Sequence, residues 1–124
     1  KCYCGRTGCL ETFISGPAIE REFKNLHGRN LKMKNIVKEA GAGNLKAEQV
    51  IKNLEDRLAR ALAHVINILD PDTIVLGGGL SNIDRLYSNV PTIWAEYIFS
   101  DDVSTVLSKA RFGDSSGVRG AAWL

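Results

Sequence analysis

The sequence contains no long apolar run and no large excess of charge of one sign. No stretch approaches the roughly 18 apolar residues of a membrane helix, and no basic segment followed by an apolar one opens the chain. We therefore expect a cytoplasmic protein without a membrane partner. The 16 basic and 14 acidic residues give a net charge of +2, too near neutral to imply a nucleic-acid partner by charge alone. A content of 44% hydrophobic residues argues against intrinsic disorder.

Internal repeats, low-complexity segments and the common nucleotide-binding fingerprints are also missing. The glycine run Gly77–Gly79 is not followed by Gly-Lys-Ser/Thr, which excludes a Walker loop, and it lacks the GxGxxG spacing of a dinucleotide site. The 124 residues have the length of one small domain. However, the chain starts at Lys1 rather than at Met, and its cysteines all lie near that start, so we expect a piece of a longer protein.

The cysteines Cys2, Cys4 and Cys9 predict a zinc site. Gly5 and Gly8 permit the tight turns that let several thiolates point at one centre, and zinc prefers four tetrahedral ligands, commonly Cys and His. Three free thiols in a reducing compartment are the alternative. A disulfide framework is less favoured, because the number of cysteines is odd and their spacing is very tight. We expect a structural metal, since no open position facing a substrate is evident.

The fourth zinc ligand is left open by the sequence. The chain has two histidines, His27 and His64. His27 falls in a predicted turn, and His64 falls within a helical pattern. Either of them, or another chain, would have to complete a tightly held zinc.

Hydrophobic spacing predicts a helix-rich α/β chain with about two strands. Helices are expected over residues 11–25, 33–40, 45–69, 86–98 and 118–124, and strands over 73–76 and 105–112. Pro17 is expected to interrupt the first helix and begin a new one. Asn44 is a good N-cap for the helix at 45–69. Residues 81–84 resemble a helix-start box, and Pro91 is expected to split the helix that follows.

The apolar, β-branched run at 73–76 suits a strand buried on both faces of a parallel sheet. The glycines Gly77–Gly79 and the helix start after them make a generic phosphate site, because bare N–H groups and the helix dipole attract an anion. A tight turn between strand and helix is the simpler alternative for these glycines.

Two polar groups are interpreted as structural. The turn Gly113–Gly117 is expected to hold capping residues, and a basic stretch is expected to form a solvated helix face. These residues are Asp114, Ser115 and Ser116 in the turn, and Arg29, Lys32, Lys34 and Lys38 in the basic stretch.

The cysteine motif belongs to a longer pattern. It reads Cys2-x-Cys4-Gly5-x-x-Gly8-Cys9-x-Glu11, and the pattern continues in Glu11–Gly16, Asp70–Gly79 and Gly113–Ala122. Together these segments resemble the ROK family, which takes its name from repressors, open reading frames and sugar kinases. All 124 residues fit, and they resemble the C-terminal part of a family chain, less than half of it. Residues 12–17 and 113–124 are most similar to bacterial fructokinases, including the manno(fructo)kinase type.

The resemblance implies a two-lobed kinase of the actin/hexokinase-like, RNase H-like fold. Residues 1–124 would form a partial C-terminal lobe of this α/β fold. Sugar binds between the lobes, and a catalytic aspartate deprotonates the sugar hydroxyl that attacks the γ-phosphate of ATP with Mg²⁺. That aspartate is expected upstream, so the resemblance implies no kinase activity and weak zinc retention for this chain alone. A homodimer is expected.

Carried over to this sequence, the resemblance assigns three groups of residues. Cys2, Cys4 and Cys9 would bind zinc with a histidine that lies just upstream. Glu11 would accept hydrogen bonds from sugar hydroxyls, although an acid in a first helical turn also complements the helix dipole. Gly77–Gly79 would form the adenosine side of the nucleotide site.

The leading interpretation is therefore part of an ATP-dependent hexose kinase that acts on fructose or a related sugar. One alternative is the effector-binding lobe of a sugar-responsive ROK repressor, in which nucleic acid would be a partner. Another is a zinc-stabilised interaction module without chemistry.

Overall fold

The computed structural model describes residues 1–122, which fall into two compact units, residues 1–58 and residues from 59 onward. As predicted, the described part is rich in helices and has two strands. The longest helix, α4 (Leu45–Leu69), supplies its first residues to the first unit and its last residues to the second.

Helix α4 begins and ends where the sequence predicts. The side-chain oxygen of Asn44 accepts the backbone N–H groups of Lys46 at 3.0 Å and of Ala47 at 3.3 Å, so it acts as the predicted N-cap. After α4, Asp70 adopts a left-handed φ of 44° and Pro71 follows, which stops the helix. None of the described helices, α4 included, is both long and apolar enough to cross a membrane.

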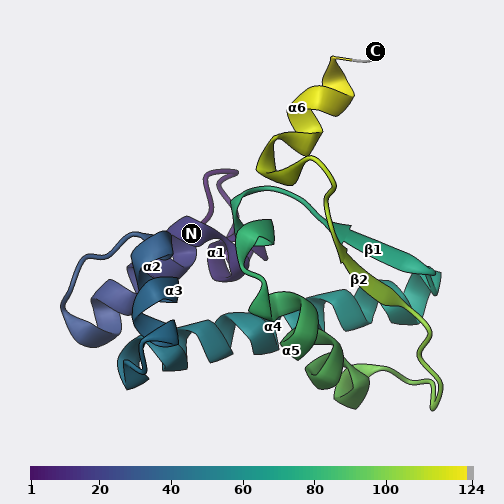
Figure 1. Ribbon diagram of the computed structural model, residues 1–124, viewed down its shortest axis with the longest axis horizontal. Coiled ribbons are helices and arrows are strands. Elements are labelled where there is room, and N and C mark those ends of the chain that lie inside the picture. The colour runs from purple at the N-terminus through teal and green to yellow at the C-terminus, as the bar shows by residue number, and fades with distance from the viewer. Residues whose placement is uncertain (123–124) are drawn as a thin grey trace. The chain divides into compact units, whose positions relative to one another are not determined.

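The first unit consists of a cysteine loop and four helices, with α2 and α3 side by side in Figure 1. The predicted break in the first helix is confirmed, because the hydroxyl of Ser15 accepts the N–H of Ala18 at 3.3 Å and Pro17 lies in the first turn of the new helix. Gly28 ends that helix with a φ of 69°. The helices are α1 (Glu11–Ile14), α2 (Gly16–His27), α3 (Met33–Gly41) and the start of α4.

Apolar side chains of α2, α3 and α4 form the buried part of the first unit. The carboxylate of Glu22 in α2 joins this packing to α4: it accepts a hydrogen bond from the side chain of Asn53 at 2.7 Å and pairs with Arg57. The buried apolar residues are Ala18, Ile19, Phe23, Ile36, Ala40, Ala47, Val50, Ile51, Leu54 and Leu58.

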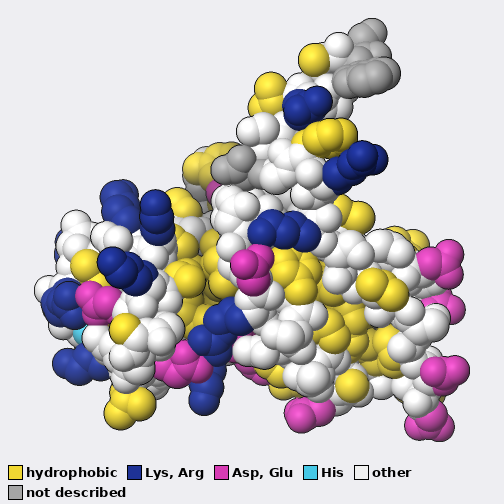
Figure 2. All heavy atoms as spheres, viewed as in Figure 1, with side chains coloured by type: hydrophobic (Ala, Val, Ile, Leu, Met, Phe, Trp, Pro, Cys, Tyr) yellow, Lys and Arg dark blue, Asp and Glu magenta, His cyan; other side chains and the backbone are white. Residues whose placement is uncertain are grey.

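The basic stretch belongs to this unit. Figure 2 shows dark blue Lys and Arg side chains over the region of α2 and α3, with acidic side chains among them. Arg29 donates to both carboxylate oxygens of Glu39, at 2.8 and 3.0 Å. Lys32 pairs with Glu20 at 3.2 Å. The stretch is thus an exposed face that is partly neutralised, in agreement with the interpretation of a solvated helix face.

The second unit contains the sheet, in which β1 (Thr73–Leu76) pairs with β2 (Val106–Lys109) in parallel (Figure 1). The prediction that the first strand is buried on both faces is wrong. Val75 and Val106 are 59% and 55% exposed on one face, while Leu107 on the other face is 7% exposed. Helix α5 contacts β2, and in the described part of the chain only one face of this two-stranded sheet is covered.

Strand β2 is shorter than the predicted 105–112. Its pairing ends with a hydrogen bond from the N–H of Ala110 to the carbonyl of Leu76, the last residue of β1, at 3.1 Å. Gly113, with a φ of 66°, then turns the chain into the 3-10 helix η3 (Gly113–Ser115) and α6 (Ser116–Ala121). The side chains of Asp114 and Ser116, to which capping roles were assigned, lie outside the described part, as do residues 123–124.

Helix α5 (Arg85–Trp94) corrects two predictions. Pro91 lies inside it and does not split it, because Leu86, Val90 and Trp94 bury one continuous apolar face that compensates for the missing N–H. The helix-start box at 81–84 is also wrong. Ser81, the first residue of the box, lies in the 3-10 helix η1 (Gly79–Asn82) and does not begin α5. After α5 the chain continues into the 3-10 helix η2 (Ala95–Tyr97).

Candidate functional site

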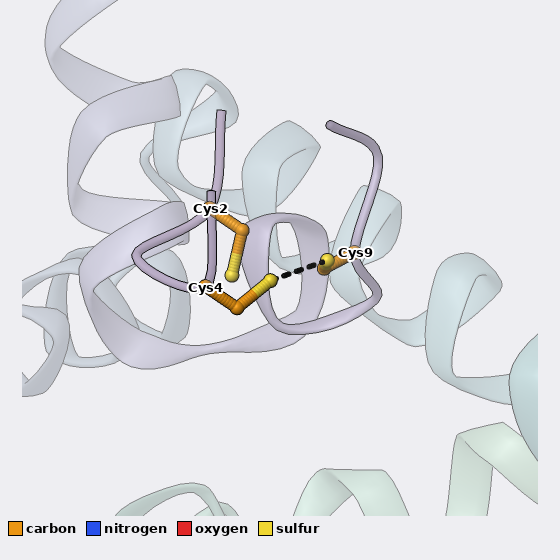
Figure 3. A group of neighbouring side chains, drawn as sticks. All are labelled: Cys2, Cys4 and Cys9. Atoms are coloured by element: carbon orange, nitrogen blue, oxygen red, sulfur yellow. Dashed lines mark hydrogen bonds between the residues drawn. The ribbon is translucent and has the colours of Figure 1, made fainter. Parts of the chain in front are cut away.

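The three cysteines of the first unit converge on one point. Their Sγ atoms all lie within 4.8 Å of one another, and Figure 3 shows the three side chains pointing toward a common centre. The sulfurs of Cys4 and Cys9 are 3.5 Å apart, and all three thiols are free. A backbone turn holds the loop, since the N–H of Cys2 donates to the carbonyl of Arg6 at 2.8 Å and the N–H of Gly5 donates back to Cys2 at 3.0 Å.

The glycines of this loop are required by its backbone. Gly5 and Gly8 have φ values of 83° and 78°, in the left-handed region that side chains other than glycine rarely adopt. The prediction that glycines let the thiols meet is therefore confirmed in this geometry.

The donor set fits a zinc ion. A tetrahedral zinc with Zn–S bonds of about 2.3 Å places its sulfurs roughly 3.8 Å apart. The sulfurs of Cys4 and Cys9 are 3.5 Å apart and all three lie within 4.8 Å of one another, so Cys2, Cys4 and Cys9 could supply three of the four ligands. Zinc binding itself stays a prediction.

Contacts within the cluster shift the pKa values of Cys4 and Cys9 in opposite directions. Hydrogen bonds from the backbone of Arg6 and from the thiol of Cys9 lower the pKa of Cys4. The same contact with Cys4 raises the pKa of Cys9. The thiolate is the form of cysteine that binds metals, so the lowered pKa of Cys4 favours the metal-binding form at Cys4 relative to Cys9.

Neither histidine joins the cluster, and the described residues offer it no fourth member. His27 ends α2 and packs edge-on against Phe23, with ring centroids 5.1 Å apart. His64 is exposed on α4. The suggestion that one of these histidines completes the site is thus not borne out by the geometry.

Glu11 is the first residue of α1 and lies two positions beyond Cys9. It is exposed, as a carboxylate that contacts a ligand must be. The helix turn that carries it is bonded to the cysteine loop, because the carbonyl of Cys9 accepts the N–H of Thr12 at 2.9 Å and its hydroxyl at 2.6 Å. The structure therefore places the predicted sugar-contacting residue directly beside the predicted metal site.

The glycine run lies in the second unit, directly after β1. Gly78 has a φ of 75°, so its backbone requires glycine. Gly77 and Gly79 do not have this conformation, and an added Cβ at either would meet no atom of the described chain within 4 Å. Neither backbone geometry nor internal packing explains these two glycines, and the space beside them is open to a ligand.

The structure adds a feature that the sequence reasoning missed. Both parallel strands end at the same edge, and each is followed by a glycine turn and a 3-10 helix. The two 3-10 helices, η1 and η3, contact each other. Ligands of α/β folds bind beyond the carboxyl ends of parallel strands, so this edge brings Gly77–Gly79 and Gly113 to one candidate site. A prediction that the two strands pair in parallel would have placed both glycine turns at the same edge of the sheet.

Polar side chains fix the chain around this edge. Lys109, the last residue of β2, donates to the carboxylate of Asp84 at 2.9 Å, which raises the pKa of Lys109. The hydroxyl of Ser81 donates to the carbonyl of Gly78 at 2.6 Å, and the hydroxyl of Tyr87 donates to the carbonyl of Ser81 at 2.8 Å. Burial raises the pKa of Tyr87. These bonds hold the glycine turn in place. The helix-start box at 81–84 included Ser81 and Asp84 but did not predict these bonds.

Known proteins are similar to this chain in sequence and in fold. The family model described as ROK family matches residues 1–124. An N-acetyl-D-glucosamine kinase of Pectobacterium carotovorum is 38% identical over 124 residues, which are 100% of this chain and 41% of that protein. The chain therefore spans about two fifths of the length of the relatives it matches.

Two solved structures extend the comparison. The ROK hexokinase of Thermus thermophilus has a TM-score of 0.83 and 28% identity, over 99% of this chain and 42% of its own. A ROK family glucokinase of Streptomyces griseus, in complex with glucose and AMPPNP, has a TM-score of 0.83 and 22% identity, over 96% and 45%. The predicted fold class, part of the actin/hexokinase-like fold, is confirmed by these likenesses.

Two finer predictions are not confirmed. The similar proteins described above are named N-acetyl-D-glucosamine kinase, hexokinase and glucokinase, so the preference for fructose stays a prediction. The comparisons give the fraction of each relative that the chain covers but not which part of the relative it is. The assignment of residues 1–124 to the C-terminal lobe therefore stays a prediction.

Proposed function

This chain belongs to the ROK family, and on that premise we propose that it is part of an ATP-dependent sugar kinase. The observation that carries the proposal is the position of Glu11, an exposed carboxylate on a helical turn that is hydrogen-bonded to the cysteine loop. A carboxylate accepts hydrogen bonds from two adjacent hydroxyls, which is the chemistry that recognises a hexose. A site built to bond a hydroxyl also rejects analogues that lack it.

The nucleotide side of the site is proposed at the carboxyl edge of the sheet. Gly77 and Gly79 leave open space that a side chain would fill, and Gly113 lies in the second turn at the same edge. Backbone N–H groups without side chains allow close approach of a ligand. We propose that this edge contacts the adenosine part of ATP.

Zinc is assigned a structural role in the proposal. Cys2, Cys4 and Cys9 would hold the ion, and the charge that it supplies would keep the three thiolates together. The ion would order the loop that precedes α1. The base that takes the proton of the attacking hydroxyl, and the groups that hold Mg²⁺, are proposed in the rest of the protein, outside residues 1–124.

The substrate class is a hexose, and the names of the relatives support N-acetylglucosamine and glucose as the first sugars to test. Fructose stays in the panel as the sequence-based prediction. Because the similar proteins are named as kinases, they also favour a kinase function over the ROK repressor that the sequence analysis left as an alternative.

The test is a steady-state assay of the full-length protein with Mg²⁺ and ATP against N-acetylglucosamine, glucose, mannose and fructose. We expect saturable ADP release with at least one sugar and none when Mg²⁺ is omitted. No ADP release with any hexose, together with sugar-dependent binding to a DNA site, would replace the kinase by the repressor.

A further inference from the structure

Helix α1, which carries Glu11, is stabilised by few interactions of its own. It is four residues long, has no buried residue, and receives no side-chain hydrogen bond from its N-cap Leu10. Isolated helical turns of this length are unstable in water. The orientation of Glu11 therefore depends on the bonds that tie α1 to its neighbours.

The shortest of these hydrogen bonds ends on a cysteine of the cluster. The carbonyl of Cys9 accepts both the N–H and the hydroxyl of Thr12, at 2.9 and 2.6 Å. The thiol of the same residue points at Cys4 in the sulfur cluster (Figure 3). Cys9 thus faces the cluster with its side chain and α1 with its carbonyl, and Glu11 lies between Cys9 and Thr12 in the chain.

We propose that Thr12 is a positioning residue that couples the cysteine cluster to Glu11. Its hydroxyl locks the carbonyl of Cys9 to the turn that presents the carboxylate, so order in the cluster is passed to the sugar-binding group. This inference rests on the sugar-kinase function proposed above. It adds a role for a residue to which no contact with sugar, nucleotide or metal has been assigned above.

A local role without function is the competing explanation, because Thr hydroxyls often bond a carbonyl of the preceding turn. The chain supplies a matched control. In α5 the hydroxyl of Thr92 donates to the carbonyl of Asn89 at 2.7 Å, also three residues back, although Thr92 is exposed and Thr12 is half-buried. Thr92→Val removes the same kind of bond in a helix that carries none of the proposed site residues.

The experiment compares Thr12→Val, Thr12→Ser and Thr92→Val in the full-length protein. We expect Thr12→Val to raise the KM for sugar about threefold to tenfold, the loss of one neutral hydrogen bond, with the KM for ATP unchanged. Zinc content should equal that of the unchanged protein, since the three thiols remain. Thr12→Ser should restore the KM for sugar, and Thr92→Val should leave it unchanged.

Amide hydrogen exchange gives a readout that does not depend on a variant or on activity. After zinc is removed from the unchanged protein with a chelator, residues 11–14 should exchange faster while α5 stays protected. The proposal is overturned if exchange at 11–14 does not change, or if Thr12→Val keeps the KM for sugar of an active enzyme. If the unchanged protein phosphorylates no sugar, the proposed function fails, and the exchange result still decides the coupling.

Discussion

The sulfurs of Cys4 and Cys9 lie 3.5 Å apart. A disulfide would need about 2.05 Å, whereas sulfurs on one tetrahedral zinc lie roughly 3.8 Å apart. The two thiols are thus free and spaced to share one ion. With Cys2, they make up the proposed metal site in the loop before α1, and loss of the metal is expected to loosen the helix that follows.

Replacing Cys4 with serine should release zinc. A hydroxyl is a much poorer zinc ligand than a thiolate, and metal-binding energy contributes directly to folding. We expect the zinc content of the full-length protein to fall from about one ion per chain to near zero, with a lower midpoint of thermal unfolding. Tyr3→Phe is the control, because Tyr3 lies in the same loop, is 88% exposed and offers no metal-binding thiol. Equal zinc content in the two variants would contradict the assignment.

Replacing Glu11 with glutamine should weaken the use of sugar. The variant keeps the shape of the side chain but loses the charged acceptor, and hydrogen bonds to charged groups contribute about 1.5–3 kcal/mol. We expect kcat/KM for sugar to fall roughly 10- to 100-fold, with the KM for ATP little changed. Glu96→Gln, the same change at an exposed position of η2, should behave like the unchanged enzyme. An unaltered kcat/KM in the Glu11 variant would remove this residue from the site.

Replacing Gly79 with alanine should weaken nucleotide binding without weakening the fold. An added Cβ meets no atom of the described chain within 4 Å, and the backbone has no left-handed φ there. We expect the KM for ATP to rise roughly tenfold, equivalent to about 1.4 kcal/mol, at an unchanged midpoint of thermal unfolding. Gly41→Ala in α3 is the control, because a Cβ there is equally unhindered. If both variants bind ATP normally, the glycine run is only a turn.

Glu20 should make stability depend on acid pH. Its carboxylate accepts the N–H of Met33 at the start of α3 at 2.9 Å and pairs with Lys32. The bond from Met33 is the main cause that lowers the pKa of Glu20 in the folded chain. A lowered pKa means that the stabilisation is present above the ordinary pKa of glutamate and is lost as the pH falls through the folded value.

Glu20→Gln should therefore lower the free energy of unfolding by about 1 kcal/mol at neutral pH, as for a lost helix cap. The difference from the unchanged protein should shrink as the pH falls below about 4. Thermal unfolding midpoints measured across this range provide the check, with Glu96→Gln as the charge-matched control. A difference that stays constant down to pH 3 would show that the charge of Glu20 is not involved.

Much of the fold could be predicted from local chemistry. Asn44 signalled the start of α4, and Pro17 signalled the break before α2, because each acts within a few residues of itself. Predictions failed where the answer depended on distant packing. Pro91 stays inside α5 because the buried residues Leu86, Val90 and Trp94 outweigh its missing N–H. Val75 is exposed because nothing in the described part covers that face of the sheet.

The candidate site follows the same division. The cysteine motif is contiguous, so the sequence could predict that the three thiols meet and that Glu11 follows them. Contact between η1 and η3 could not be predicted from either glycine turn alone, since it depends on the parallel register of β1 and β2. The hydrogen bond from Thr12 to Cys9 could not be predicted from the motif either, because a hydroxyl that bonds a carbonyl three residues back has no distinctive sequence pattern.

Phosphorus NMR of the full-length protein with Mg²⁺, ATP and N-acetylglucosamine or glucose tests the central claim most directly. The account predicts that the γ-phosphate signal of ATP decays while a sugar monophosphate signal grows at the same rate. It also predicts that Glu11→Gln slows this transfer and that Glu96→Gln does not. Release of inorganic phosphate without any sugar phosphate, or equal rates for the two variants, would contradict it.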